Sequence, residues 1–244
     1  MGLEYASQLA AKGYDLILVS NREEELKSAG ERLETAYTVR VTTHFQDLAA
    51  PDAADLLYDW CVRQCGILPD VLINNAGMFF FKELSIEDLD RVQAMLNLHM
   101  VTVTRSCLLF GEAMKKRGSG RILIMSSMAA RIPAPGITIY SATKAYLKSF
   151  GRSLSYELKP YGVSVTTVCP AAIATPLYRL DEKKMKLGVR CGLIHTPKWL
   201  VRRAIRAMLH GRRVISPSLM NLWLPALIAL LPGPLVAAIW KRLK

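Results

Sequence analysis

A tyrosine and a lysine one helical turn apart are the residues of this chain best suited to acid–base chemistry. The segment YSATK at 140–144 places Tyr140 and Lys144 at positions i and i+4, on one face of an expected helix. A phenol has a pKa near 10, and a neighbouring ammonium lowers it by favouring the phenolate. Taken alone, the pair is more often a surface tyrosine and lysine of an amphipathic helix.

A serine thirteen residues before the tyrosine supplies a third polar group. Ser127 directly follows the apolar run 121–126, which reads as a buried strand. Open α/β sheets bind ligands at the carboxyl ends of their strands. Ser127 would there donate a hydrogen bond to a carbonyl oxygen while Tyr140 protonates that oxygen.

A turn rich in asparagine follows another apolar run. The sequence NNAG at 74–77 comes directly after 71–73, and its two amides and glycine suit a tight turn. An ordinary strand-ending turn would use the same residue types. The pattern becomes specific when it is joined to Asp47, which follows the preceding strand-like run, and to Asn97, which lies in the next helical stretch.

The elements that must position these residues alternate along the chain. Apolar, β-branched runs predict strands at Tyr14–Ser20, Thr38–His44, Val71–Ile73, Arg121–Ser126, Val163–Val168 and Val214–Ser216. Helical patterns cover residues 2–12, 22–36, 52–65, 86–117, 138–159 and 197–210. This alternation predicts an α/β fold, a doubly wound Rossmann-type parallel sheet with helices on both faces. Residues 175–196 are the least regular, and we expect a flap there.

Composition excludes several classes of protein. The 244 residues are 51% hydrophobic and 21% charged, which excludes an intrinsically disordered chain. The net charge of +12 would suggest a nucleic acid or an anionic membrane as a partner. Residues 1–178 hold 18 basic and 18 acidic residues, however, so the whole excess lies in 179–244.

The end of the chain differs from the rest. Residues 219–240 contain no charged side chain and are flanked by Arg212, Arg213, Lys241 and Arg242. Their prolines favour two short apolar helices in a membrane interface over one straight span. We therefore expect a catalytic domain at 1–217 and a membrane-associating C-terminal tail at 218–244. No groove-reading motif accompanies the cations, so no nucleic acid is expected.

The cysteines and histidines give no sign of a metal site. The five cysteines show no paired zinc spacing, and the four histidines are scattered. We expect reduced structural thiols, hydrogen-bonded or surface histidines, and no metal.

Taken together, these motifs resemble the short-chain dehydrogenases/reductases that use serine, tyrosine and lysine. The resemblance runs from Gly2 to about Ser216 and rests on the asparagine-rich turn, the Ser127–Tyr140–Lys144 spacing, and Pro170 with Thr175. It implies that Tyr140 is the general acid or base, that Lys144 tunes its pKa and bonds the nicotinamide ribose, and that Ser127 binds the carbonyl. Asn97 is similar to an asparagine that holds a relay water.

The same resemblance implies a set of cofactor contacts. Besides Tyr140 and Lys144, the expected cofactor-binding residues are Gly2, Arg22, Asp47, Asn75, Ala76, Gly77, Pro170 and Thr175. Two departures concern this set. Ala171 stands where the family usually has glycine, and of the family's glycine-rich phosphate loop only Gly2 is present. We therefore expect that this chain lacks the family's first strand and most of that loop, which a misassigned start or a truncated gene would explain.

The residues after the second expected strand bear on the choice of cofactor. NAD would require an acidic residue at that strand end, but Ser20 stands there with Arg22 close by, and arginine accommodates a 2′-phosphate. NADP is therefore the expected cofactor and NAD the less favoured one. A solvated Arg22 in the first turn of a helix is the competing interpretation.

The sequence thus predicts an NADP-dependent oxidoreductase at the cytoplasmic face of a membrane. It would reduce a carbonyl, or oxidise a secondary alcohol, on a hydrophobic lipid-like small molecule, in the manner of ketoacyl and hydroxysteroid reductases. A homo-oligomer is expected by analogy with the family. The alternative is a catalytically impaired relative that serves as a membrane-binding or partner-binding module.

Overall fold

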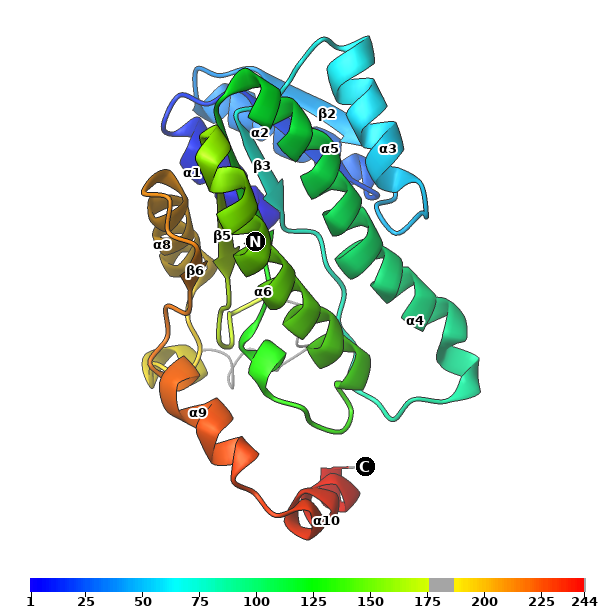
Figure 1. The fold of residues 1–244 in the computed structure, drawn as a ribbon. Helices are drawn as coiled ribbons and strands as arrows, with labels where there is room; N and C mark the ends of the chain where they lie inside the picture. The colour runs from blue at the N-terminus through cyan, green and yellow to red at the C-terminus, as the bar shows by residue number, and fades with distance from the viewer. Residues whose placement is uncertain (176–186, 244) are drawn as a thin grey trace.

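The computed structural model describes residues 1–175 and 187–243, and these form a parallel sheet between two layers of helices (Figure 1). The first half of the chain contains α1 (Gly2–Ala10), β1 (Leu16–Ser20), α2 (Glu23–Ala36), β2 (Val41–Phe45), α3 (Ala53–Tyr58), the π-helix η1 (Asp59–Gln64), β3 (Val71–Asn74), η2 (Ile86–Asp88), α4 (Leu89–Leu96), the π-helix η3 (Asn97–Val101) and α5 (Thr102–Arg117). The second half contains β4 (Gly120–Met125), η4 (Met128–Arg131), α6 (Thr138–Leu158), η5 (Lys159–Tyr161), β5 (Val163–Val168), α8 (Pro197–Leu209), β6 (Val214–Ile215), α9 (Met220–Ala229) and α10 (Gly233–Leu243).

The side chains of β4 show how the layers are built. Ile122 and Ile124 pack with α5 and α6 on one face, whereas Leu123 and Met125 pack with α1 and α8 on the other. All four side chains are buried, because successive residues of a strand point to opposite faces and both faces are covered. The predicted doubly wound α/β architecture is therefore confirmed.

The strand order leaves a gap in the middle of the sheet. β1 pairs only with β2, and the second group of strands has the order β3-β4-β5-β6, with every pair parallel. Within the described residues no strand lies between β1 and β3. Both strands instead line a cavity of about 1560 Å³, whose walls include Tyr5 and Leu9 of α1 and Phe110 of α5.

The predicted strands all form, with small shifts of their ends. The strands predicted to begin at Tyr14 and Thr38 begin later in the sequence, at Leu16 and Val41. The amide of Tyr14 donates to the Leu9 carbonyl at 3.2 Å, as part of the turn that ends α1, and the amide of Val39 closes a turn on Tyr37. β1 and β2 therefore begin after these turns in the sequence.

The helical stretch predicted at 86–117 is confirmed in its bounds, but it is built from several types of helix. It begins as the 3₁₀ turn η2 and contains the π-turn η3 at Asn97–Val101. There the side chain of Asn97 donates to the Ala49 carbonyl at 3.0 Å, and Thr102 donates to the Leu48 carbonyl at 2.8 Å. The π-turn thus accompanies docking of this helix on the loop after β2.

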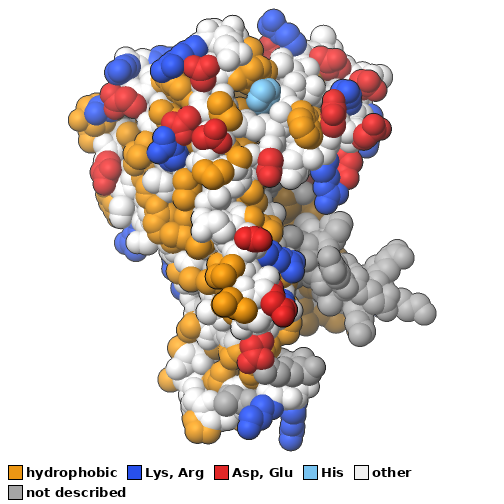
Figure 2. All heavy atoms as spheres, turned by 90° about the vertical axis from the view of Figure 1, so that its right-hand side faces the viewer, with side chains coloured by type: hydrophobic (Ala, Val, Ile, Leu, Met, Phe, Trp, Pro, Cys, Tyr) orange, Lys and Arg blue, Asp and Glu red, His pale blue; other side chains and the backbone are white. Residues whose placement is uncertain are grey.

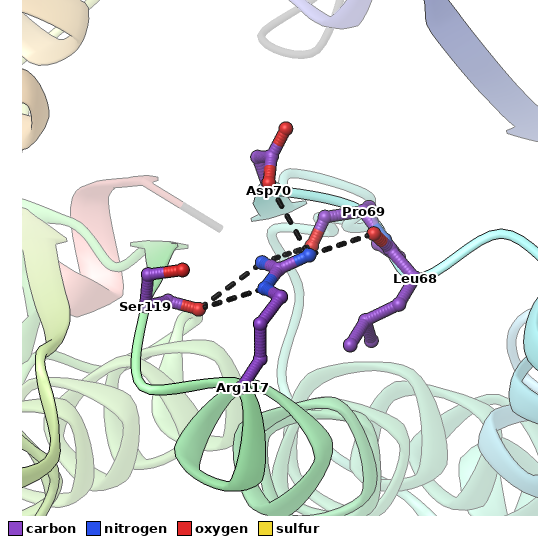
Figure 3. Close-up of polar contacts among 5 residues, drawn as sticks. All are labelled: Leu68, Pro69, Asp70, Arg117 and Ser119. Carbon is purple, nitrogen blue, oxygen red and sulfur yellow. Dashed lines mark hydrogen bonds and ion pairs between the residues drawn. The ribbon is translucent and has the colours of Figure 1, made fainter.

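An arginine at the end of α5 secures the start of β3 (Figure 3). Arg117 donates to the carbonyls of Leu68 and Pro69 at 3.0 and 3.2 Å and pairs with Asp70 at 3.2 Å. It also donates to the carbonyl of Ser119, just before β4. Because β3 has a strand partner on one side only, these bonds are a large part of what fixes its entry to the sheet.

The C-terminal tail forms the two apolar helices that its prolines predicted. α9 and α10 meet at an angle of 109° and extend from the lower end of the body (Figure 1). Among the described helices none is long and apolar enough by itself to cross a membrane, and only this bent pair meets the criterion when taken together. Of the expected flap at 175–196, residues 176–186 lie outside the described structure. Residues 187–190 are helical, and Ile173 pairs with His195.

Candidate active site

Ser127 lies where β4 ends, and its backbone leaves the sheet there in an extended conformation. It caps the short helix η4, and its Oγ accepts a hydrogen bond from the Ala129 amide at 3.1 Å. The residue is buried at 8% exposure and lines the large cavity. The strand end and the cap together fix the hydroxyl at the carboxyl edge of the sheet, as the sequence predicted.

Tyr140 and Lys144 lie on the buried face of α6. Lys144 Nζ is 5.6 Å from the centroid of the Tyr140 ring, and both side chains line the same cavity as Ser127. Lys144 Nζ donates to the Met125 carbonyl at 3.0 Å, and Ser126 Oγ donates to the Lys144 carbonyl at 2.7 Å. The end of β4 therefore holds the lysine in place from two sides.

The burial of Lys144 decides its electrostatics. Loss of hydration lowers its pKa from 10.5 to about 8, with a smaller opposing contribution from Cys169. Lys144 is still mostly an ammonium at neutral pH, so it remains a positive charge beside the tyrosine ring. A surface lysine would keep its positive charge well above pH 9. Lys144 therefore stays charged over a narrower pH range than a surface lysine does.

The cofactor-side residues predicted from sequence line the same cavity as Ser127, Tyr140 and Lys144. Its walls include Gly2, Arg22, Asp47, Asn75, Ala76, Gly77, Pro170 and Thr175. The start of α1 lies over the asparagine-rich turn, and a Cβ built on Gly2 would be 3.2 Å from Asn75 Nδ2. The structure thus places the start of α1 next to the asparagine-rich turn, so that both belong to the expected cofactor site.

Asn97 is the predicted catalytic residue that lies apart from this wall. It is buried at 8% exposure, accepts from Gln93 Nε2 at 2.9 Å and donates to the Ala49 carbonyl. Its side chain therefore anchors the loop that follows Asp47. The relay-water role that the resemblance implies for Asn97 stays a prediction.

Arg22 and Asp47 lie at the opposite end of the cavity. Arg22 Nη1 pairs with Glu25 at 2.7 Å, and both side chains are largely exposed. Asp47 Oδ1 accepts from the Ala49 amide at 3.1 Å and from Asn21 Nδ2 at 3.4 Å. Arg22 would therefore have to exchange Glu25 for a phosphate in order to bind one.

The residues present fit a dinucleotide along this cavity. The first turn of a helix leaves backbone N–H groups without helix partners, and Gly2 and Leu3 of α1 line the cavity wall. Lys144 and Tyr140 supply hydrogen-bonding groups to the same cavity, and Asn75 and Asp47 also line it. This donor set suits a phosphate at α1 and a ribose near Lys144.

The aromatic run after the turn joins the site in part. Phe79 packs edge to face on Tyr140, with ring centroids 4.9 Å apart, whereas Phe80 is buried and lies under the Arg91 guanidinium. Phe81 meets Trp240 of α10 edge to face at 5.7 Å. Of these three rings, one therefore borders Tyr140 and another is buried.

Sequence reasoning missed the contacts between the tail and the site. Asn221 of α9 is fully buried, and its Nδ2 donates to the carbonyl of Cys169, directly before Pro170. Arg131 of η4 donates to the Asn221 carbonyl, and Ser218 hydrogen-bonds His195 at 3.0 Å. The signal available in the sequence was an asparagine in an otherwise apolar segment.

Comparison with known proteins places the chain in a family. The family model for short chain dehydrogenase matches residues 1–186, and the chain belongs to that family. It shares 31% identity with the very-long-chain 3-oxoacyl-CoA reductase of Rattus norvegicus over 75% of this chain and 59% of the relative. The corresponding protein of Meyerozyma guilliermondii is 30% identical over 88% of this chain and 62% of its own length. The chain therefore spans about three fifths of the length of these relatives.

Solved structures support the fold. A short-chain dehydrogenase from Sphingobium yanoikuyae in complex with NADPH superposes with a TM-score of 0.78 at 24% identity, covering 95% of this chain and 93% of the other. A 7beta-hydroxysteroid dehydrogenase gives 0.81 at 20% identity, covering 92% and 86%. Both chains wind a parallel sheet of the kind described above.

Proposed function

We propose that this member of the short-chain dehydrogenase family reduces a carbonyl group on a hydrophobic, lipid-like substrate with NADP(H), or oxidises the matching secondary alcohol. The observation that carries the proposal is the burial of Ser127, Tyr140 and Lys144 around one cavity that also reaches the cofactor-side turn. The names of the curated relatives favour a long-chain 3-oxoacyl thioester as the substrate class.

The chain's own residues would handle the oxygen of the reacting carbonyl. Tyr140 donates its phenolic proton to that oxygen during reduction and takes it back during oxidation. Ser127 donates a hydrogen bond to the same oxygen and orients the carbonyl. The Lys144 ammonium favours the phenolate that Tyr140 leaves behind. Bound NADPH supplies the hydride that reaches the carbonyl carbon.

The position of Arg22 supports NADP over NAD. Its guanidinium lines the cavity at the carboxyl end of β1, where Ser20 replaces the acidic residue that NAD would favour. Glu25 competes for this guanidinium in the structure. A 2′-phosphate carries more charge than one carboxylate and would displace Glu25 from a pair that is open to solvent.

A membrane surface is the proposed site of action. The tail exposes large apolar side chains, namely Leu219, Leu222, Trp223, Leu227, Leu230 and Leu235. Figure 2 shows basic side chains at the tip of this end, below a body whose surface mixes both charges. Cations beside apolar helices suit an anionic cytoplasmic leaflet, and each contributes about 1 kcal/mol near the surface.

The substrate assignment has a direct test. The purified protein should oxidise NADPH with 3-oxoacyl thioesters and should turn over long chains faster than short ones, because an apolar chain adds binding near Phe79 and the tail. Equal rates for a four-carbon and a sixteen-carbon substrate would rule out the lipid assignment. A family of small polar ketones in the same assay serves as the control.

A non-catalytic membrane or partner module is the second candidate, and the gap between β1 and β3 favours it. Without a strand there, the backbone groups on the facing edges of both strands lack sheet partners within the described residues. Titration with NADPH, followed by its fluorescence, separates the two functions. Saturable binding supports the reductase. Vesicle binding without any NADPH binding, by this chain and by a chain extended at its N-terminus, supports the module.

A further inference from the structure

A buried histidine connects the cofactor-side turn to the helix of the catalytic pair. His99 lies in the π-turn η3, two residues after Asn97, and is 1% exposed. Its Nε2 accepts a hydrogen bond from the Met78 amide at 3.1 Å, and its Nδ1 lies 2.9 Å from Thr143 Oγ1. Both ring nitrogens are therefore engaged, each by a different element.

The chemistry of the partners fixes the direction of each bond. A backbone N–H can only donate, so Nε2 carries no proton and the neutral ring holds its hydrogen on Nδ1. Nδ1–H then donates to Thr143, and the Thr143 hydroxyl donates to the Tyr140 carbonyl at 2.9 Å. The bonds run in one direction, from the turn through the imidazole to the backbone of the catalytic tyrosine.

The neutral form of the ring is strongly favoured. Burial, and to a lesser extent the charge of Lys144, lowers the pKa of His99 to about 2. A protonated ring would present a second N–H to the Met78 amide, and two donors would then face each other. The ring is therefore neutral at neutral pH and can act as a fixed link there.

The surroundings leave little freedom for the turn. A Cβ built on Gly77 would lie 3.2 Å from His99 Nε2 and 3.8 Å from Lys144 Nζ. The His99 ring also meets the Tyr140 ring, with centroids 6.0 Å apart. The turn, the imidazole and the catalytic pair are thus packed against one another.

We propose that His99 is a positioning residue, which ties the turn at Asn75–Met78 to Tyr140 and Lys144 through one fixed tautomer. The part concerning turnover rests on the proposed reductase function, and the tie itself does not. The substrate never touches His99. The effect of His99 on the reaction is the spacing that it keeps between the cofactor wall and the proton donor.

Two measurements test the tie without any assay of activity. The ¹⁵N shifts of the His99 ring at neutral pH should show a proton on Nδ1 and none on Nε2, and the opposite tautomer would overturn the proposal. Hydrogen exchange at the Met78 amide should be slow in the wild type and at least tenfold faster in His99→Leu. His99→Gln should restore slow exchange, because its Oε1 takes the place of Nε2. Equal exchange in all three proteins would also overturn the proposal.

Kinetics then test the consequence. We expect His99→Leu to lower kcat about 10- to 100-fold with little change in the KM of the carbonyl substrate, because small displacements of reacting groups cost this much. His99→Gln should recover most of this loss. Thr143→Val should lower kcat while leaving Met78 protected, since it breaks only the other end of the link. His210→Leu, at an exposed histidine, is the control.

The outcomes separate the two proposals. A wild-type protein that protects Met78 but turns over no substrate retains the tie and rejects the reductase. A wild-type reductase whose kcat is unaffected by His99→Leu rejects the positioning role. If His99→Leu does not fold, the tautomer of the wild-type His99 ring still tests the tie, and the kcat of Thr143→Val relative to the wild type tests the positioning role.

Discussion

Lys144 illustrates how one buried side chain can serve chemistry at the expense of stability. Its ammonium is held by the Met125 carbonyl within a cavity wall, and burial lowers its pKa to about 8. The unfolded chain would bind that proton up to a pKa near 10.5. Between these two values the unfolded state holds more protons, so the free energy of unfolding should rise with pH across this window.

Replacing Lys144 should therefore show how much its burial lowers the free energy of unfolding. We expect Lys144→Met to abolish turnover and to raise the free energy of unfolding at pH 7 by about 1–3 kcal/mol, because an apolar side chain needs no hydration. Urea unfolding at pH 7 and at pH 10 measures this, and the difference should shrink at the higher pH. A destabilised Lys144→Met at pH 7 would mean that the hydrogen bond to Met125 outweighs the burial of charge.

Tyr140 is the residue on which the proposed reaction depends directly. We expect Tyr140→Phe to lower kcat by about 100-fold or more, because the proton donor is lost, while the fold and cofactor binding are kept. Stopped-flow NADPH oxidation measures the loss. Tyr156→Phe is the matched control, since Tyr156 lies on the outer face of the same helix and is 49% exposed.

The pair of Arg22 and Glu25 provides a test of cofactor preference. We expect Arg22→Ala to raise the KM of NADPH about tenfold while leaving that of NADH nearly unchanged, because the guanidinium meets only the 2′-phosphate. Glu25→Gln should lower the KM of NADPH, since it releases Arg22 from its present partner. Steady-state kinetics with both cofactors measure this, and parallel changes for the two cofactors would refute the assignment.

At the scale of elements, β3 is an edge strand of the described four-stranded sheet. It pairs with β4 on one side and faces the cavity on the other, and its entry is held by the Arg117 side chain (Figure 3). The turn at 74–77 continues directly from this strand. Any movement of β3 would therefore carry Asn75 and Gly77 away from the catalytic pair.

Removing the arginine should loosen this strand. We expect Arg117→Ala to lower the free energy of unfolding by about 2 kcal/mol, because several carbonyl oxygens lose a charged donor in a partly exposed site. Thermal or urea unfolding measures the change. Arg63→Ala removes a solvent-exposed i,i+4 pair and should have almost no effect, which makes it a suitable comparison.

For the molecule as a whole, the tail is part of the body as well as the proposed lipid-binding surface. Ser218 and Asn221 are buried against residues that border the site, while the outer side chains of α9 and α10 face solvent. The boundary expected at residue 217 therefore falls before two residues that pack on the catalytic domain. A deletion at that point would disturb the loop at Cys169 together with the proposed membrane contact.

Point substitutions on the exposed face test membrane contact more cleanly. We expect Leu227→Glu with Leu230→Glu to weaken binding to anionic vesicles at least tenfold, because apolar area is lost and like charges are added. Vesicle sedimentation at low and high salt measures this. Leu108→Glu, at a leucine of α5 that is 54% exposed compared with 52% for Leu227, should leave the binding unchanged. Unchanged binding by the tail variant would disprove the membrane role of the tail.

The sequence by itself determined the strand-helix alternation and identified Ser127, Tyr140 and Lys144 as the candidate catalytic residues. The apolar run of β4 and the i,i+4 spacing of Tyr140 and Lys144 are local patterns, so a chain read residue by residue reveals them. The apolar composition and prolines of the tail likewise determined its two short helices. Such features depend on neighbours in the chain, and no distant contact is needed to predict them.

Only the tertiary structure decided which distant groups meet. Three features join residues that lie far apart in the sequence. They are the docking of the π-turn at Asn97, the link from Met78 through His99 to Thr143, and the anchoring of Asn221 at Cys169. Burial also lowered the pKa of Lys144, and the spacing of residues in the sequence does not predict this shift. These properties arise from packing, where hydration is lost and each polar group must find a partner in another element.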